Sequence, residues 1–189
     1  MKSLQKKISK VVQNVYSPIW EKIKSPIQDP INQQLEIMSS LALFKDIPKN
    51  TIKLIRSRCH LRNYKKNEVI FNEGEPGIGL YIVIEGKVEI FREKNNKKTI
   101  LSTLEVGDFF GELSLLLVDK PRSASAIALE PTTLLGFFNP DLKVIMKRNP
   151  HIASIILLNI ANILGERLIK TNELLEKYLN ISGEYYEKD

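Results

Sequence analysis

The stretch that decides the fold is Phe110-Gly111-Glu112-Leu113-Ser114-Leu115-Leu116-Leu117-Val118-Asp119-Lys120-Pro121-Arg122-Ser123-Ala124. A glycine and a carboxylate open it, and an arginine preceded by a proline closes it, ten positions after Glu112. Leucine fills four of the five positions from 113 to 117. We therefore expect this segment to be anchored in a core and to hold Glu112 and Arg122 at fixed positions on one rim.

The residue types in this stretch favour a ligand that carries both a phosphate and sugar hydroxyls. A carboxylate accepts hydrogen bonds from a pair of hydroxyls, and an arginine can donate two parallel charge-assisted hydrogen bonds to a phosphate. Backbone N–H groups at the start of a helical turn after Gly111 would add donors for the same anion. The alternative is a structural turn with a buried Glu112–Arg122 ion pair, which is costly to desolvate without further hydrogen bonds.

The stretch resembles the phosphate-binding cassette of cyclic nucleotide-binding domains, and its spacing is similar to that of the catabolite activator-like branch of the family. The pattern is F-G-E, an aliphatic residue, a small residue and Leu, then a short insert and P/E-R-S/T/A-A. The resemblance implies that Glu112 holds the ribose 2′-hydroxyl, Arg122 the cyclic phosphate, and that Ser123 adds a hydroxyl. The other expected cradle residues are Gly111, Leu113 and Ala124.

The segments around the cassette read as short β-strands. Apolar and alternating runs over 68–71, 80–84, 87–91, 99–104, 124–129 and 133–138 are separated by turn signals. Strands at this spacing with Gly-rich turns are typical of an antiparallel jelly roll. We predict a mainly β fold, a jelly-roll barrel with flanking N-terminal helices and a long C-terminal helix. Residues 93–98 are predicted to form a polar loop.

The C-terminal helix is predicted from Pro150 to about residue 180, because Asn149-Pro150 is a helix-start signal. Residues at heptad spacing predict a coiled-coil homodimer seam: Leu157, Ile160, Leu164, Arg167, Thr171, Leu174, Tyr178 and Ile181. The alternative is a helix that folds back on its own barrel. The resemblance places Thr171 and Asn172 against the nucleotide base, one from each subunit, although Thr171 could instead specify coiled-coil register. Leu101 and Leu104 are expected to form the apolar wall for the base.

The beginning of the chain differs in composition from the rest. Residues 1–34 carry six lysines against Glu21 and Asp29, and residues 2–16 have the periodicity of a basic amphipathic helix. Residues 1–24 could contact an anionic membrane surface or dock a partner; the alternative is that their apolar stripe packs on the domain or across a dimer. The predicted organisation is a basic extension (1–34), a binding domain (35–149), a long helix (150–182) and a polar tail (183–189).

Composition narrows the class of protein. The 189 residues are 43% hydrophobic and 26% charged, which is ordinary for a globular domain. The single cysteine, Cys59, excludes a disulfide framework, and His60 and His151 lie far apart, so we expect no metal. We see no signal peptide and no apolar run of about 18 residues, and expect a cytoplasmic protein.

These patterns lead to a regulatory function rather than an enzyme. The first hypothesis is a stand-alone sensor of cyclic AMP, or less favourably cyclic GMP, that signals to an unknown effector protein by repositioning its C-terminal helix. The alternative is a degenerate fold that acts as a scaffold or as a membrane- or partner-docking module. In the family's bacterial activators a helix-turn-helix domain follows the long helix, and because few residues follow it here we expect no specific DNA binding.

Overall fold

The computed structural model describes residues 29–117 and 120–186. The chain divides into two compact units, Met1–Gln33 and Gln34–Asp189. The predicted basic helix over residues 2–16 lies outside the described residues, so the membrane or partner contact of residues 1–24 stays a prediction. The fold below is that of the second unit.

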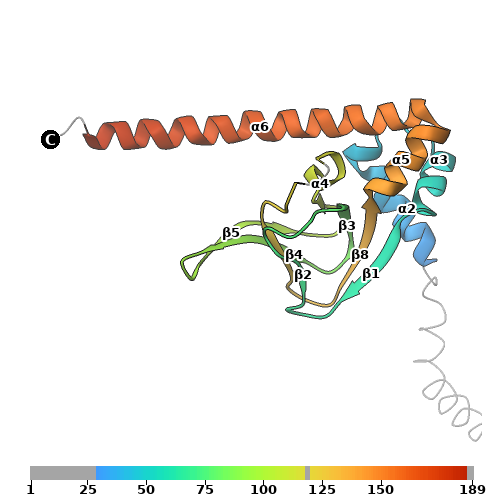
Figure 1. Cartoon of the computed structure of the whole chain (residues 1–189), viewed down its shortest axis with the longest axis horizontal. Coiled ribbons are helices and arrows are strands. Elements are labelled where there is room, and N and C mark those ends of the chain that lie inside the picture. Colours follow the sequence, from blue (N-terminus) through green and yellow to red (C-terminus); the bar gives the residue numbers. More distant parts are fainter. Residues whose placement is uncertain (1–28, 118–119, 187–189) are drawn as a thin grey trace, which may run out of the picture. The chain divides into compact units, whose positions relative to one another are not determined.

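The described chain forms helices at both ends and strands between them (Figure 1). In order the elements are α2 (Pro30–Ser40), η1 (Ala42–Phe44), α3 (Lys49–Arg56), β1 (His60–Tyr64), β2 (Val69–Phe71), β3 (Gly79–Glu85), β4 (Val88–Lys94), β5 (Lys97–Leu104), β6 (Phe109–Phe110), α4 (Leu113–Leu116), β7 (Ser125–Ala128), β8 (Thr132–Phe138), α5 (Asn139–Arg148) and α6 (Pro150–Tyr186).

The strands form two four-stranded sheets, ordered β1-β8-β3-β6 and β2-β7-β4-β5, and every strand pair is antiparallel. The predicted jelly roll with flanking helices and a long C-terminal helix is therefore confirmed. The predicted polar loop over residues 93–98 is wrong. Asn95 and Asn96 have φ values of 52° and 58°, the conformation of a two-residue hairpin turn, so β4 and β5 continue to Lys94 and Lys97.

Strand β3 separates two apolar cores. Leu80, Ile82 and Ile84 belong to the core shared with the helices, whereas Tyr81 and Val83 belong to the core between the sheets. Successive side chains of a strand point to opposite faces, so this strand is buried on both sides. It therefore joins the helical layer to the interior of the barrel.

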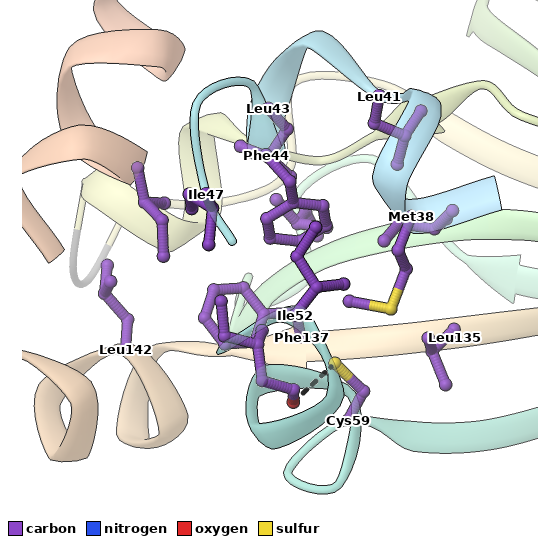
Figure 2. Packing of buried hydrophobic residues seen from close by; sticks show 14 of the residues in the cluster. Met38, Leu41, Leu43, Phe44, Ile47, Ile52, Cys59, Leu135, Phe137 and Leu142 are labelled. Atoms are coloured by element: carbon purple, nitrogen blue, oxygen red, sulfur yellow. Dashed lines mark hydrogen bonds between the residues drawn. The ribbon is translucent and has the colours of Figure 1, made fainter. Parts of the chain in front are cut away.

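The helical layer packs on the outer face of β3 and β8 (Figure 2). The largest fully buried side chains of the core between the helices and these strands include Met38, Phe44, Ile52 and Phe137. Cys59 lies at the edge of this core, where its thiol donates a hydrogen bond to the carbonyl of Ile55 at 3.4 Å. Burial raises the pKa of the Cys59 thiol to about 12, so this cysteine is a neutral core residue.

The first third of α6 packs on this core, and residues 165–177 are exposed. Among the α6 side chains that the structure describes, the buried ones are Ala153, Ile156, Asn159 and Ile160. Asn159 donates from its amide to the carbonyls of Leu43 at 3.1 Å and Lys45 at 2.9 Å, which fixes α6 on η1. By length and composition Pro150–Lys177 could also cross a membrane, and 22% of its apolar window is buried in the protein.

The predicted coiled-coil seam is corrected by this packing. Leu157, Ile160 and Leu164 pack on the protein's own core, so the first half of that seam is the barrel-facing stripe of the helix. A second stripe lies one position further along and faces outward. Its large residues, 54–62% exposed, are Leu158, Leu168, Leu175 and Leu179.

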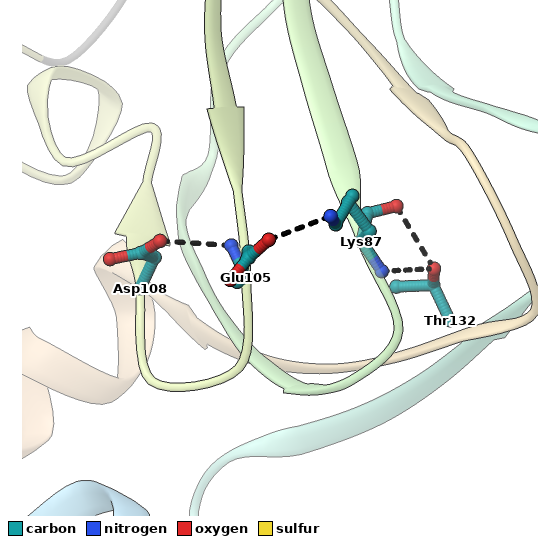
Figure 3. A network of polar contacts seen from close by, with 4 residues as sticks. All are labelled: Lys87, Glu105, Asp108 and Thr132. Atoms are coloured by element: carbon teal, nitrogen blue, oxygen red, sulfur yellow. Dashed lines mark hydrogen bonds and ion pairs between the residues drawn. The ribbon is translucent and has the colours of Figure 1, made fainter.

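A polar network fixes the turn that leads into the cassette (Figure 3). Lys87 forms an ion pair with Glu105 at 2.6 Å, and the Asp108 carboxylate accepts a hydrogen bond from the Glu105 N–H at 2.8 Å. Gly107 lies in this turn with φ +90°. The network joins the β3–β4 turn to the β5–β6 turn, and so sets where β6 and the cassette begin.

Candidate functional site

A cavity of about 800 Å³ lies at the cassette. It is lined by Phe71, Glu73, Gly74, Ile90, Ser102, Leu104, Phe109, Phe110, Gly111, Glu112, Leu113, Ser114, Leu117, Lys120, Pro121, Arg122, Ser123, Ala124 and Arg167. Its volume falls in the range of small-molecule sites. Both ends of the cassette thus meet at one cavity, as the sequence predicted for Glu112 and Arg122.

The Arg122 guanidinium is buried and held by several groups. Arg122 is 5% exposed. Its Nη1 donates to the carbonyl of Gly79 at 2.9 Å, to the hydroxyl of Ser114 at 3.1 Å and, more weakly, to the carbonyl of Gly111 at 3.5 Å. Its Nε is buried and has no hydrogen-bond partner among the described residues. One nitrogen of a fixed fork therefore remains free to donate.

Aromatic rings lie beneath this cation. The guanidinium carbon of Arg122 is 4.1 Å from the centroid of the Phe71 ring and 5.8 Å from that of Tyr81. Among the described residues no carboxylate oxygen lies within 4.0 Å of its nitrogens. Burial lowers the pKa of Arg122 from its usual value, yet an arginine remains a cation in proteins. The Glu112–Arg122 ion pair, the alternative interpretation of the cassette, is therefore not formed.

Two glycines leave room for this arginine. A Cβ on Gly111, where φ is +79°, would lie 2.5 Å from Arg122 Nη1. A Cβ on Gly77 would lie 2.0 Å from the Ser114 Oγ that Arg122 contacts. A side chain at either position would displace the guanidinium or its partner. Glycine in the Phe-Gly-Glu sequence is therefore favoured by the space that Arg122 occupies as well as by the positive φ.

Glu112 is paired instead with a residue of the C-terminal helix. The buried Glu112 carboxylate accepts a hydrogen bond through Oε1 from Nη1 of Arg167 on α6. The Arg167 guanidinium also lies 5.5 Å from the centroid of the Phe109 ring. Arg167 is half exposed and Glu112 is buried. One oxygen of the carboxylate is therefore occupied by α6, at the wall of the cavity.

Most of the predicted site residues line the cavity. These are Gly111, Glu112, Leu113, Arg122, Ser123, Ala124 and Leu104. Leu113 and Leu117 do so while 40% and 49% exposed, whereas Leu115 is buried, so the expected anchoring by the leucine run rests mainly on Leu115. Ser123 is exposed, and its carbonyl accepts a hydrogen bond from Arg92 at 2.6 Å.

Three predicted residues lie away from the cavity. Leu101 is 52% exposed and falls where the β4–β5 register shifts, between Ile90 paired with Ser102 and Phe91 paired with Ile100. Leu101 is one position from Ser102 and three from Leu104, so strand alternation points it away from the cavity that those two residues line. Thr171 and Asn172 are exposed on α6, and the Thr171 hydroxyl donates to the Arg167 carbonyl at 2.7 Å.

Several residues that line the cavity were not predicted from the sequence. Ile90 and Ser102 are a cross-strand pair, and they lie two positions from Val88 and Leu104, so strand alternation from Leu104 would have found Ser102. Arg167 is four residues before Thr171, on the same helix face. Within the described residues no group of three or more His, Cys, Asp or Glu could hold a metal ion.

Comparisons with known proteins place this cavity in context. The family model for the cyclic nucleotide-binding domain matches residues 61–149. The cyclic AMP receptor protein of Thermus thermophilus is 36% identical over 132 residues, which are 69% of this chain and 59% of that protein. A cGMP-dependent protein kinase of Plasmodium berghei is 31% identical over 125 residues, which are 62% of this chain and 14% of the kinase.

A solved structure gives the same result for the fold. The crystal structure of the Thermus thermophilus catabolite activator protein superposes with a TM-score of 0.65 at 34% identity, covering 71% of this chain and 62% of that one. The chain thus spans about 60% of the length of the bacterial regulators that it matches. Similarity to the kinase is confined to a small part of that protein.

Proposed function

Because residues 61–149 belong to the cyclic nucleotide-binding domain family, we propose that the chain is a regulatory protein that binds cyclic AMP, or less favourably cyclic GMP, at the cassette cavity. The observation that carries the proposal is Arg122, a buried cation with an unpartnered Nε. A buried charge without an ionic partner is unfavourable, and a cyclic phosphate would supply one. Glu112 would then accept from the ribose 2′-hydroxyl.

The residues expected at the base end of the cavity come from β4, β5 and β6. Leu104, Ile90 and Phe109 supply apolar surface, and Ser102 supplies a hydroxyl. A serine hydroxyl can donate or accept, so this wall alone does not discriminate adenine from guanine. Relatives named for cyclic AMP and for cyclic GMP both match the chain. Cyclic AMP is favoured because the cyclic AMP receptor protein of Thermus thermophilus matches the chain at 36% identity, against 31% for the cGMP-dependent kinase.

The signal would leave the site through α6. Arg167 pairs with the Glu112 carboxylate that would also accept from the ribose hydroxyl, so a bound nucleotide would change the contact that holds the helix at the cavity. A ligand shifts an equilibrium only by its differential affinity for the two arrangements. We infer that the nucleotide, Glu112 and Arg167 form the coupling between the cavity and the helix.

The outward stripe of α6 would bind a second copy of the chain. Leu158, Leu168, Leu175 and Leu179 are exposed at spacings of ten, seven and four residues, which are sums of the three- and four-residue steps of a coiled-coil seam. Asn172 lies between Leu168 and Leu175 on this stripe. In such a dimer Asn172 would lie at the interface, in agreement with its predicted contact to the partner subunit's nucleotide.

The test is isothermal titration of the full chain with cyclic AMP and cyclic GMP. Arg122→Ala should weaken binding by about 1.5–3 kcal/mol or more, as loss of hydrogen bonds to a charged group does. Arg148→Ala, which removes an exposed arginine at the end of α5, is the matched control and should bind as the wild type does. Absence of heat and of a thermal shift with both nucleotides would overturn the proposal and favour a docking module.

A further inference from the structure

Arg122 is surrounded by neutral groups rather than by a counter-ion. Its Nη1 contacts two backbone carbonyls and a serine hydroxyl, and its guanidinium lies on the face of Phe71. The electrons on an aromatic face attract a cation, and the attraction is stronger where water is excluded. The protein therefore stabilises this charge with dipoles and an aromatic ring. Neither carries a negative charge, so the guanidinium can still pair with an anion.

The position of Phe71 is specified by the strand that carries it. Strand β2 pairs with β7, and the register shifts between Val69 and Phe71, which pairs with Ala126. A bulge of this kind re-aims a side chain. The Phe71 ring lines the cavity and packs at 5.8 Å on the ring of Phe110, the residue before Gly111. The Phe71 side chain thus contacts a residue at each end of the cassette, Phe110 and Arg122.

We propose that Phe71 is a positioning residue for the phosphate of the ligand: its ring orients and stabilises the Arg122 guanidinium without neutralising it. The inference rests on the function proposed above. A carboxylate at this position would pair with Arg122 and compete with the phosphate, and an aliphatic residue would fill the space without attracting the cation. An aromatic ring attracts the cation and does not compete with the phosphate.

The test compares Phe71→Leu with Phe71→Tyr, which keeps an aromatic face. Each variant is titrated with cyclic AMP and with adenosine, the neutral nucleoside that shares the ribose and base but lacks the phosphate. For Phe71→Leu, the affinity for cyclic AMP should fall roughly five- to thirty-fold, the range of a desolvated cation–π contact. Its affinity for adenosine should not change, and Phe71→Tyr should bind both as the wild type does.

The outcomes separate this inference from the function on which it rests. If Phe71→Leu weakens cyclic AMP and adenosine equally, or weakens neither, Phe71 is only a core residue and the inference is overturned while the binding function stands. If the wild type binds neither cyclic AMP nor cyclic GMP, both proposals fail. Should Phe71→Leu not fold, the NMR chemical shift of the Arg122 Nε proton in the wild type tests the inference instead. This proton should resonate upfield because of the Phe71 ring, and a shift typical of a solvated arginine contradicts the inference.

Discussion

Replacing Gly111 by alanine tests whether the cassette glycine makes room for Arg122. At φ +79° an alanine is strained, which costs about 1–2 kcal/mol of stability. Its Cβ would also lie 2.5 Å from Arg122 Nη1 and 3.1 Å from the Gly79 carbonyl, so the guanidinium must move. Loss of a charge-assisted contact of about 1.5–3 kcal/mol should then weaken cyclic AMP binding roughly 10- to 150-fold.

Gly107→Ala is the matched control for this experiment. Gly107 has φ +90°, and a Cβ there would meet nothing within 4 Å. Urea denaturation should show the loss from the left-handed conformation in both variants, and a further loss in Gly111→Ala because its Cβ also displaces the guanidinium. Isothermal titration should show weakened cyclic AMP binding in Gly111→Ala alone. Equal losses of affinity in the two variants would refute the steric argument and leave backbone strain as the common cause.

Three further changes test other parts of the structure. Asn159→Leu removes the hydrogen bonds to the Leu43 and Lys45 carbonyls and should cost about 1–3 kcal/mol of stability in urea denaturation; an unchanged midpoint contradicts the role given to this amide. Burial, followed by the charge of Asp141, raises the pKa of Cys59 from 9.0 to about 12, so its neutral thiol contributes stability below pH 9 that is lost as the pH rises toward 12. Cys59→Ala should therefore show a shallower alkaline fall of the urea midpoint than the wild type, and parallel curves would refute the assignment. Leu168→Lys with Leu175→Lys should convert a dimer to a monomer in sedimentation velocity, and a monomeric wild type would contradict the proposed coiled coil.

The sequence predicts the barrel and most of the cavity because their signals are local. Residue types between Phe110 and Ala124 are sufficient to identify the cassette, and strand alternation identifies the sheets. The misplaced residue, Leu101, lies three positions from Leu104. Successive side chains of a strand point to opposite faces, so Leu101 and Leu104 cannot both face the cavity, whereas Ser102 and Leu104 can.

The contacts of α6 were harder to predict because they depend on rotation of the helix about its axis. Apolar residues cover two neighbouring stripes, one through Leu157 and Leu164 and another through Leu158 and Leu168. Heptad spacing identifies a stripe but not which one faces the barrel. Asn159, which hydrogen-bonds the helix to η1, fixes that rotation. Once the rotation is fixed, Arg167 falls at Glu112, a contact between residues 55 positions apart.

The length of α6 gives it the properties of a lever. Ile160 is the last buried residue among those of α6 up to residue 177, and the helix continues to Tyr186. At 1.5 Å per residue the arm beyond this fulcrum is about 39 Å long. A tilt of about 10° at the fulcrum would carry its tip about 7 Å, whereas Arg167, roughly 10 Å along the arm, would move by about 2 Å. In the proposed function, a change no larger than one hydrogen-bond length at the cavity would thus be amplified into a displacement that a bound protein could detect.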